Sequence, residues 1–110
     1  MNKNILQSDT ILNSFIETVV PEIRKYFNPS KILIFGSRVS GEATENSDID
    51  VIIVSDFFRG IKFVKRMADV LRKIKFSRHI DFICYTPEEF EKIQESSTVV
   101  KAALLEGIFA

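Results

Sequence analysis

Apolar residues in the first quarter of the chain recur at spacings of three and four. They are Ile11, Leu12, Phe15, Ile16, Val19, Val20, Ile23, Tyr26 and Phe27. This period predicts an amphipathic helix that buries one face. Ser8 or Asp9 could cap its start, and Asn28-Pro29-Ser30 ends it, because the residue before a proline is driven out of the helical region. Pro21 either kinks this helix or begins a second short one.

Two apolar runs with the character of strands come next. The first, Lys31 to Phe35, stops at the pair Gly36-Ser37. A polar interval of ten residues then leads to Asp48-Ile49-Asp50, at the start of a second apolar run that ends near Ser55. Two strands joined by a short helical or looped excursion are the simplest interpretation.

The second half of the chain predicts three helices and one more strand. The run Arg59 to Phe76 has apolar residues at helical spacing and basic residues on the complementary face, and the apolar run His79 to Tyr85 predicts a third strand. Thr86-Pro87-Glu88-Glu89 has the pattern of a capping box with proline at the first helical position. The mostly apolar stretch Thr98 to Phe109 predicts a last helix. The order of elements indicates the α/β (α+β) class, and 110 residues suit one domain spanning 1–110.

Composition places the chain among ordinary globular proteins. Apolar residues make up 45% and charged residues 27%, which argues against a disordered or membrane protein. No apolar stretch approaches the roughly 20 residues needed to span a bilayer. The N-terminal stretch MNKNILQSD lacks the features of a signal peptide, and the single Cys84 excludes an internal disulfide framework. We therefore expect a cytoplasmic protein without a membrane partner.

The charges are unevenly distributed although the formal net charge is zero. Between Arg59 and Arg78 there are eight basic residues and one acidic residue, Asp69. This stretch is either a solvated helix face or a surface that attracts an anionic partner, a nucleotide or an acidic protein. Only Phe63 and Phe76 are aromatic in this stretch, too few for an extended stacking surface, so direct binding of nucleic acid is not expected.

Asp48 and Asp50 lie two residues apart at the start of a predicted strand, so both carboxylates project from the same face. Like charges at this spacing repel each other and raise the pKa of one carboxyl unless a cation lies between them. Carboxylate oxygens suit Mg²⁺, which completes its coordination with water and substrate phosphates. Asp81 stands near the start of the third predicted strand. If that strand lies beside the second, the three carboxylates converge at one edge or face of the sheet.

The pair Gly36-Ser37 predicts a turn that binds phosphate. Glycine lets the backbone approach a phosphate closely, and the amides of a following helical turn carry partial positive charge. Ser37 adds a hydroxyl donor, and Arg38 either neutralises charge on a triphosphate or forms a surface ion pair. The chain contains neither the Gly-Lys-Ser/Thr of a Walker loop nor the GxGxxG of a dinucleotide site.

Gly36-Ser37, then ten residues, then Asp48-Ile49-Asp50, resembles the signature of the nucleotidyltransferases of the DNA polymerase beta superfamily. More narrowly, it resembles the minimal nucleotidyltransferase (MNT) branch, small prokaryotic proteins commonly partnered with HEPN-domain proteins. The resemblance covers about Lys31 to Tyr85. It implies the nucleotidyltransferase fold with a small mixed sheet of about three strands, ATP bound through Gly36-Ser37, and two Mg²⁺ held by Asp48 and Asp50. Asp81 would ligate one metal and help to deprotonate the attacking hydroxyl.

In the MNT antitoxins that the chain resembles, AMP is transferred to a tyrosine of the partner HEPN toxin, an RNase that is thereby silenced. The resemblance therefore implies an enzyme acting as an antitoxin. One alternative is a module that neutralises its partner by contact alone, and another is nucleotide transfer to a small molecule such as an aminoglycoside. Clustered carboxylates favour the enzyme, because a module without catalysis has no physical reason to keep them.

Larger relatives carry a second domain for the acceptor, so we expect the missing contacts from a partner or a second copy, in a homo- or hetero-oligomer. The apolar stretch Val99 to Phe109 either covers the sheet or contacts another subunit. The remaining candidates are given structural interpretations. We expect His79 to be a surface residue at a strand end and Cys84 to be a core residue, and Tyr26 and Tyr85 to serve in packing.

Overall fold

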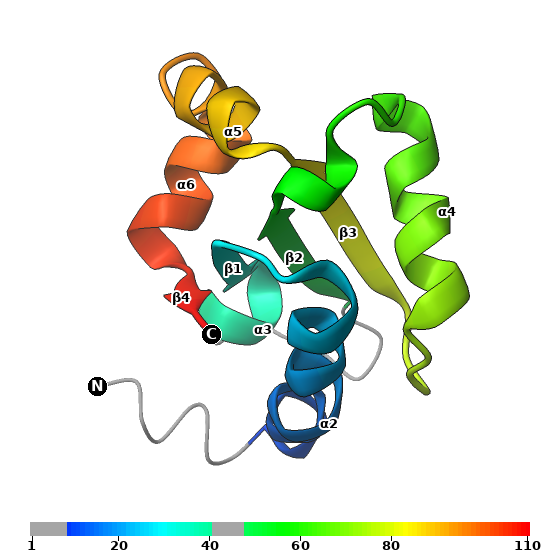
Figure 1. Cartoon of the computed structure of the whole chain (residues 1–110). Coiled ribbons are helices and arrows are strands. Elements are labelled where there is room, and N and C mark those ends of the chain that lie inside the picture. Colours follow the sequence, from blue (N-terminus) through cyan, green and yellow to red (C-terminus); the bar gives the residue numbers. More distant parts are fainter. Residues whose placement is uncertain (1–8, 41–47) are drawn as a thin grey trace.

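The computed structural model describes residues 9–40 and 48–110. Within these ranges the chain forms a four-stranded sheet flanked by helices (Figure 1). In chain order the elements are α2 (Thr10–Phe27), β1 (Lys31–Phe35), α3 (Ser37–Ser40), β2 (Ile49–Val54), the 3₁₀ helix η1 (Asp56–Phe58), α4 (Phe63–Lys73), β3 (Ile80–Tyr85), α5 (Pro87–Ile93), α6 (Thr98–Glu106) and β4 (Ile108–Phe109). The predicted α/β class with a mixed sheet is confirmed.

The sheet has the strand order β3-β2-β1-β4. β1 pairs with β2 and with β4 in antiparallel fashion, whereas β2 and β3 are parallel. Phe35 at the end of β1 lies opposite Asp50, and Asp50 in turn lies opposite Asp81 on β3. The end of β1 and the starts of β2 and β3 therefore meet at one end of the sheet.

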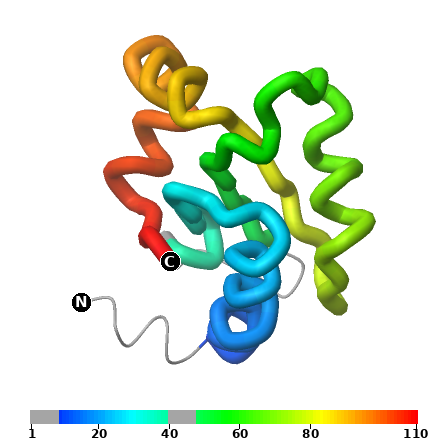
Figure 2. The backbone as a smooth tube through the Cα atoms, in the orientation of Figure 1, coloured from blue at the N-terminus to red at the C-terminus, as the bar shows by residue number. Residues whose placement is uncertain are grey.

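Each face of the sheet packs against its own pair of helices. One core joins the inward residues of α2 and α4 to one face, and a second core joins α5 and α6 to the other through Phe90, Val100 and Ala103. Figure 2 shows α4 and α6 on opposite sides of the strands. Strand alternation explains this, because Val51 belongs to the first core and its neighbour Ile52 to the second.

Several predicted boundaries are confirmed by local hydrogen bonds. Asp9 caps α2 by accepting a hydrogen bond from the Leu12 amide at 2.9 Å, and Asn28 ends that helix in the left-handed conformation. The capping box of Thr86 and Glu89 is present at the start of α5. α2 continues through Pro21 as one helix, so the alternative of a second short helix is wrong.

The fourth strand departs from the prediction, which extended the last helix to Phe109. The helix ends at Glu106 because Gly107 follows it. A Cβ on Gly107 would lie 2.5 Å from the Ala103 carbonyl oxygen and 2.7 Å from that of Ile34, so the chain can pass this point only with glycine. Beyond it the chain pairs with β1, where Ile108 lies opposite Ile34.

The helix predicted over Arg59 to Phe76 is shorter in the structure, and its basic residues are not all on an exposed face. Gly60 adopts a φ of +82° and separates η1 from α4. Arg66 is buried against Glu89 instead of facing solvent, while the exposed Arg72 pairs with Asp69. Ion pairs thus neutralise part of the basic stretch.

Part of the stretch Val99 to Phe109 covers the sheet, and part is exposed, while its contact with another subunit stays a prediction. Val100 and Ala103 are buried on the sheet, whereas Val99 and Phe109 are exposed and Leu105 is 86% exposed.

Within the two described ranges, no helix combines the length and apolar character that crossing a membrane requires.

Candidate active site

Four side chains with metal-binding chemistry lie on one face at the start of the two parallel strands. Asp50 of β2 and Asp81 of β3 are register partners. Asp48 and His79 each stand two residues earlier, and the Ile49 amide donates to the His79 carbonyl oxygen at 3.4 Å. Because side chains two residues apart share a face, the four residues form a two-by-two array.

The structure brings the predicted carboxylates together. Asp48, His79 and Asp81 each offer one ligand atom, and these atoms lie within 4.8 Å of one another. Asp50 and Asp81 are register partners on neighbouring strands, close enough for Asp81 to raise the pKa of Asp50. The structure thus groups Asp48 with Asp81 and places Asp50 beside them, while the roles of the three aspartates as catalytic and metal-binding residues stay predictions.

The electrostatics of the array favour a cation. Partial burial raises the pKa of Asp50, and the negative charges of Asp81 and Asp48 raise it further. The pKa of His79 is also raised, chiefly by its hydrogen bond with Asp81 and then by the charge of that carboxylate. A divalent cation among these oxygens would relieve the repulsion, and carboxylates are the ligands that Mg²⁺ prefers. The donor set thus fits the metal that the sequence predicts.

Gly36 adjoins the array at the end of β1. It has a φ of +94°, and a Cβ built on it would overlap the Oδ2 atom of Asp50. Glycine is therefore required twice over, for the backbone conformation and for the close approach of the carboxylate. Ser37 follows as the first residue of α3. The turn expected to bind phosphate is thus placed directly beside Asp50.

Arg38 lies deeper than the sequence suggests. It is 5% exposed, and its guanidinium is 3.1 Å from the carboxylate of Asp9. The ion pair considered for this residue is present, but it is buried and not on the surface. It ties the short α3 to the first residues of α2, because Asp9 also caps that helix. A contact of Arg38 with nucleotide stays a prediction.

His79 is the member of the array that sequence reasoning discounted. It is exposed at the start of β3, as expected of a residue at a strand end, but its Nε2 lies 2.9 Å from Asp81 Oδ1. The signal that could have revealed it is the spacing of two residues to Asp81, which equals the spacing of Asp48 to Asp50. Cys84 is buried as predicted.

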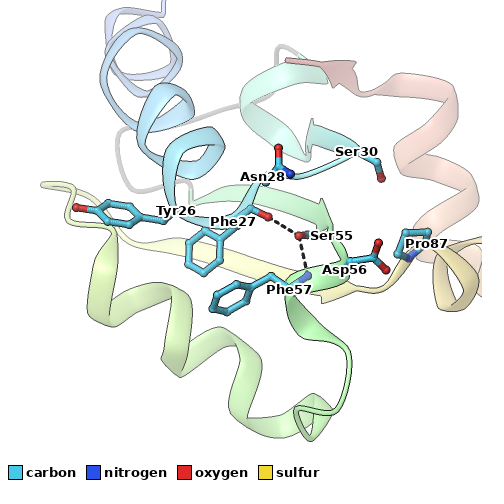
Figure 3. Close-up of a pocket in the computed structure, with 8 residues that line it drawn as sticks. All are labelled: Tyr26, Phe27, Asn28, Ser30, Ser55, Asp56, Phe57 and Pro87. Carbon is cyan, nitrogen blue, oxygen red and sulfur yellow. Dashed lines mark hydrogen bonds between the residues drawn. The ribbon is translucent and has the colours of Figure 1, made fainter.

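A cavity of about 290 Å³ lies elsewhere, near the residues that follow β2 (Figure 3). Its lining residues are Tyr26, Phe27, Asn28, Ser30, Ser55, Asp56, Phe57 and Pro87. The Ser55 hydroxyl donates to the Phe27 carbonyl oxygen and accepts from the Phe57 amide, so its polar group is used in holding α2 and η1 together. None of the predicted site residues lines this cavity.

Comparison with known proteins finds a matching family and similar folds. The family model of the polymerase beta nucleotidyltransferases matches residues 17–105, which include the turn and the three aspartates. A structure from Sulfolobus solfataricus, described as a candidate nucleotidyltransferase, has a TM-score of 0.65 and 22% identity, covering 99% of this chain and 87% of that one.

A second structure, BolA1 from Arabidopsis thaliana, has a TM-score of 0.51 and 21% identity, covering 66% of this chain and 92% of that one. At these identities both structural likenesses show the fold alone. A search of curated proteins finds no match. On the strength of the family match over most of its length, the chain belongs to the polymerase beta nucleotidyltransferase family.

Proposed function

We propose that this protein is a Mg²⁺-dependent nucleotidyltransferase that transfers AMP from ATP to a hydroxyl group. The observation that carries the proposal is the convergence of Asp48, Asp50 and Asp81 beside the Gly36 turn. Asp48, Asp50 and Asp81 would hold two Mg²⁺. When bound, the ions supply charge neutralisation for the triphosphate and for the oxygens that gain charge during transfer.

The protein's own groups position the reactants and take the proton. In the reaction, the acceptor oxygen forms a bond with the α-phosphorus of ATP as the bond to pyrophosphate breaks. Asp81 accepts the proton of the attacking hydroxyl. Gly36 leaves the backbone open to the phosphates, the Ser37 hydroxyl donates to a phosphate oxygen, and Arg38 adds positive charge beneath the turn.

The acceptor we propose is a tyrosine hydroxyl on a HEPN-type toxin, which makes this protein the antitoxin of a toxin–antitoxin pair in the cytoplasm. Support comes from the spacing of Gly36-Ser37 and Asp48-Ile49-Asp50, which resembles the MNT branch. The exposed apolar side chains Val99, Leu105 and Phe109 give α6 and β4 a surface suited to a protein partner or a second copy.

The test is incubation with labelled ATP, Mg²⁺ and the product of the neighbouring gene. We expect the partner to gain one or more AMP groups, detected by mass spectrometry, and to lose its RNase activity. Asp48→Asn should abolish both effects, whereas Asp56→Asn, an exposed aspartate outside the array, should retain them.

Two results would point to the other functions. Neutralisation of the partner that survives replacement of Asp48, Asp50 and Asp81 would mean that contact alone is sufficient. AMP found on an aminoglycoside, with none on the partner protein, would mean that the acceptor is a small molecule.

A further inference from the structure

We infer that His79 is a nitrogen ligand of the divalent metal bound by Asp48 and Asp81, and that it shifts the preference of the site from Mg²⁺ towards Mn²⁺. The inference rests on the proposed function, because it concerns the metal of that reaction. It goes beyond it by adding a fourth residue to the three carboxylates and by naming the class of ion that the site selects.

Position is the first argument. His79 Nε2 lies 2.9 Å from Asp81 Oδ1, and one ligand atom from each of Asp48, His79 and Asp81 lies within 4.8 Å of the other two. Two adjacent ligands of an octahedral ion, each bound at roughly 2.1 Å, are about 3 Å apart. The imidazole and the carboxylate are therefore already at the separation of neighbours in one coordination shell.

The backbone fixes this arrangement. The Ile49 amide donates to the His79 carbonyl oxygen at 3.4 Å, which holds the start of β3 against the start of β2. His79, just before β3, is two residues from Asp81, as Asp48, just before β2, is from Asp50, and this spacing puts the side chains of each pair on one face. The imidazole is also exposed, so packing does not explain its orientation towards the carboxylates.

Ligand chemistry then sets the selectivity. Mg²⁺ prefers oxygen ligands, whereas an imidazole nitrogen raises the affinity for transition ions. Mn²⁺ accepts carboxylate oxygens as readily as Mg²⁺ does and gains more from a nitrogen. A site with carboxylates alone would discriminate less between the two ions than one that includes His79.

The experiment measures binding of Mn²⁺ and of Mg²⁺ by the full chain without nucleotide, together with electron spin echo spectra of bound Mn²⁺. The chain has one histidine, so any imidazole nitrogen coupled to the ion must belong to His79. We expect nitrogen coupling in the wild type and its absence in His79→Gln. We also expect the affinity of His79→Gln for Mn²⁺ to fall at least about tenfold while that for Mg²⁺ changes little.

His79→Gln is chosen because its amide can still donate a hydrogen bond to Asp81. If His79 served only as a charged partner of that carboxylate, its replacement would strengthen the binding of both ions, and the inference would be wrong. Absence of nitrogen coupling, or failure of the wild type to bind Mn²⁺, would also overturn it. Thermal unfolding without metal verifies that the variant folds, which the exposure of His79 favours.

The outcome can be separated from that of the proposed function. Nitrogen coupling without AMP transfer would support the metal ligand and contradict the transferase. AMP transfer with Mg²⁺ and no nitrogen coupling would support the transferase and contradict the ligand. Asp48→Asn provides the matched control, since it should weaken the binding of both ions together.

Discussion

The two ends of the β2–β3 pair differ in how their charged groups are satisfied. At the end where these strands finish, Arg66 is buried and bound on several sides. At the end where they begin, Asp48, Asp50 and Asp81 face one another as like charges. Both ends are polar and lie on the same two strands, so the contrast separates charged groups that stabilise the fold from charged groups that are left repelling one another.

Arg66 shows what a structural charge looks like in this protein. Its guanidinium donates to the carbonyl oxygens of Ile61 at 2.9 Å and Cys84 at 3.1 Å, and to the carboxylate of Glu89 at 2.5 and 3.2 Å. Glu89 in turn accepts from the Thr86 amide at 2.8 Å. The hydrogen bonds from Arg66 lower the pKa of Glu89. These groups join α4, β3 and α5.

Asp50 shows the opposite case. Its pKa is raised by burial and by the two neighbouring carboxylates, so ionising it in the folded protein is unfavourable. Gly36 brings the backbone against the same carboxylate. The buried charge is satisfied at one end of the two strands and repulsion is concentrated at the other, which is the pattern expected of a functional site at the second end.

The largest expected effect is on chemistry. Asp50→Asn should lower the rate of AMP transfer by about 10²–10³-fold, the range seen when one preorganised electrostatic group is removed from an active site. The same variant should unfold at an equal or higher temperature in chelator, because it removes a repelling charge. The assays are single-turnover AMP transfer and thermal denaturation. If Asp50→Asn were clearly less stable than the wild type, the carboxylate would have a structural role, and the two ends of the β2–β3 pair would not differ in the way described.

Arg66→Met should show the reverse behaviour. Its loss removes the guanidinium donors of two backbone carbonyls and of Glu89, which should lower the free energy of unfolding by about 3 kcal/mol. Chemical denaturation measures this change, and AMP transfer at low temperature should persist. Arg72→Met is the matched control, because Arg72 forms an exposed pair with Asp69 whose loss should cost below about 0.5 kcal/mol.

Gly36→Ala and Gly60→Ala sharpen the comparison within one residue type. Both glycines have positive φ, so alanine should cost each about 1 kcal/mol in backbone strain. At Gly60 a Cβ would meet nothing within 4 Å, whereas at Gly36 it would displace the Asp50 carboxylate. Only Gly36→Ala should therefore weaken Mn²⁺ binding and AMP transfer. Equal effects of the two variants on both assays would mean that the contact with Asp50 is unimportant.

The smallest expected effect is on the pH dependence of stability. Carboxylates at the two ends of the β2–β3 pair should change the free energy of unfolding in opposite directions as the pH rises. Glu89 has a lowered pKa. Its stabilising contribution to the free energy of unfolding is therefore present above the unfolded pKa of 4.5 and is lost as the pH falls through the pKa of the folded protein. Asp50 has a raised pKa. Its stabilising contribution to the free energy of unfolding is therefore present below the unfolded pKa of 3.8 and is lost as the pH rises through the pKa of the folded protein.

Denaturation of Glu89→Gln and Asp50→Asn in chelator, from pH 3 to pH 7, would measure these slopes. The advantage of the wild type over Glu89→Gln should shrink towards low pH. The advantage of Asp50→Asn over the wild type should grow towards neutral pH. Parallel curves for the wild type and Asp50→Asn would contradict the assignment of Asp50 as a repelled carboxylate.

Much of the fold and the site follows from local sequence. The period of the first helix, the capping box at Thr86 and the apolar run after Asp50 each depend on neighbours within a few residues. The turn at Gly36 and the positions of the carboxylates of Asp48 and Asp50 were predictable for the same reason. Such features need no knowledge of distant contacts.

What could not be predicted depends on pairing between distant segments. The parallel register that places Asp81 opposite Asp50 had to be assumed, and with it the position of His79 beside Asp48. The last strand is formed by pairing with β1, which overrides the apolar pattern that favoured a longer helix. The burial of Arg66 likewise depends on Glu89, 23 residues away.

The parallel pairing of β2 with β3 has a kinetic consequence. β1 and β2 can pair early as antiparallel neighbours, but Asp81 reaches Asp50 only after α4 has carried the chain back along the sheet. The repulsion of Asp81 with Asp48 and Asp50 is therefore absent until β3 has paired with β2. Divalent ions should therefore lower mainly the unfolding rate, by holding β3 against β2, and should have little effect on the folding rate.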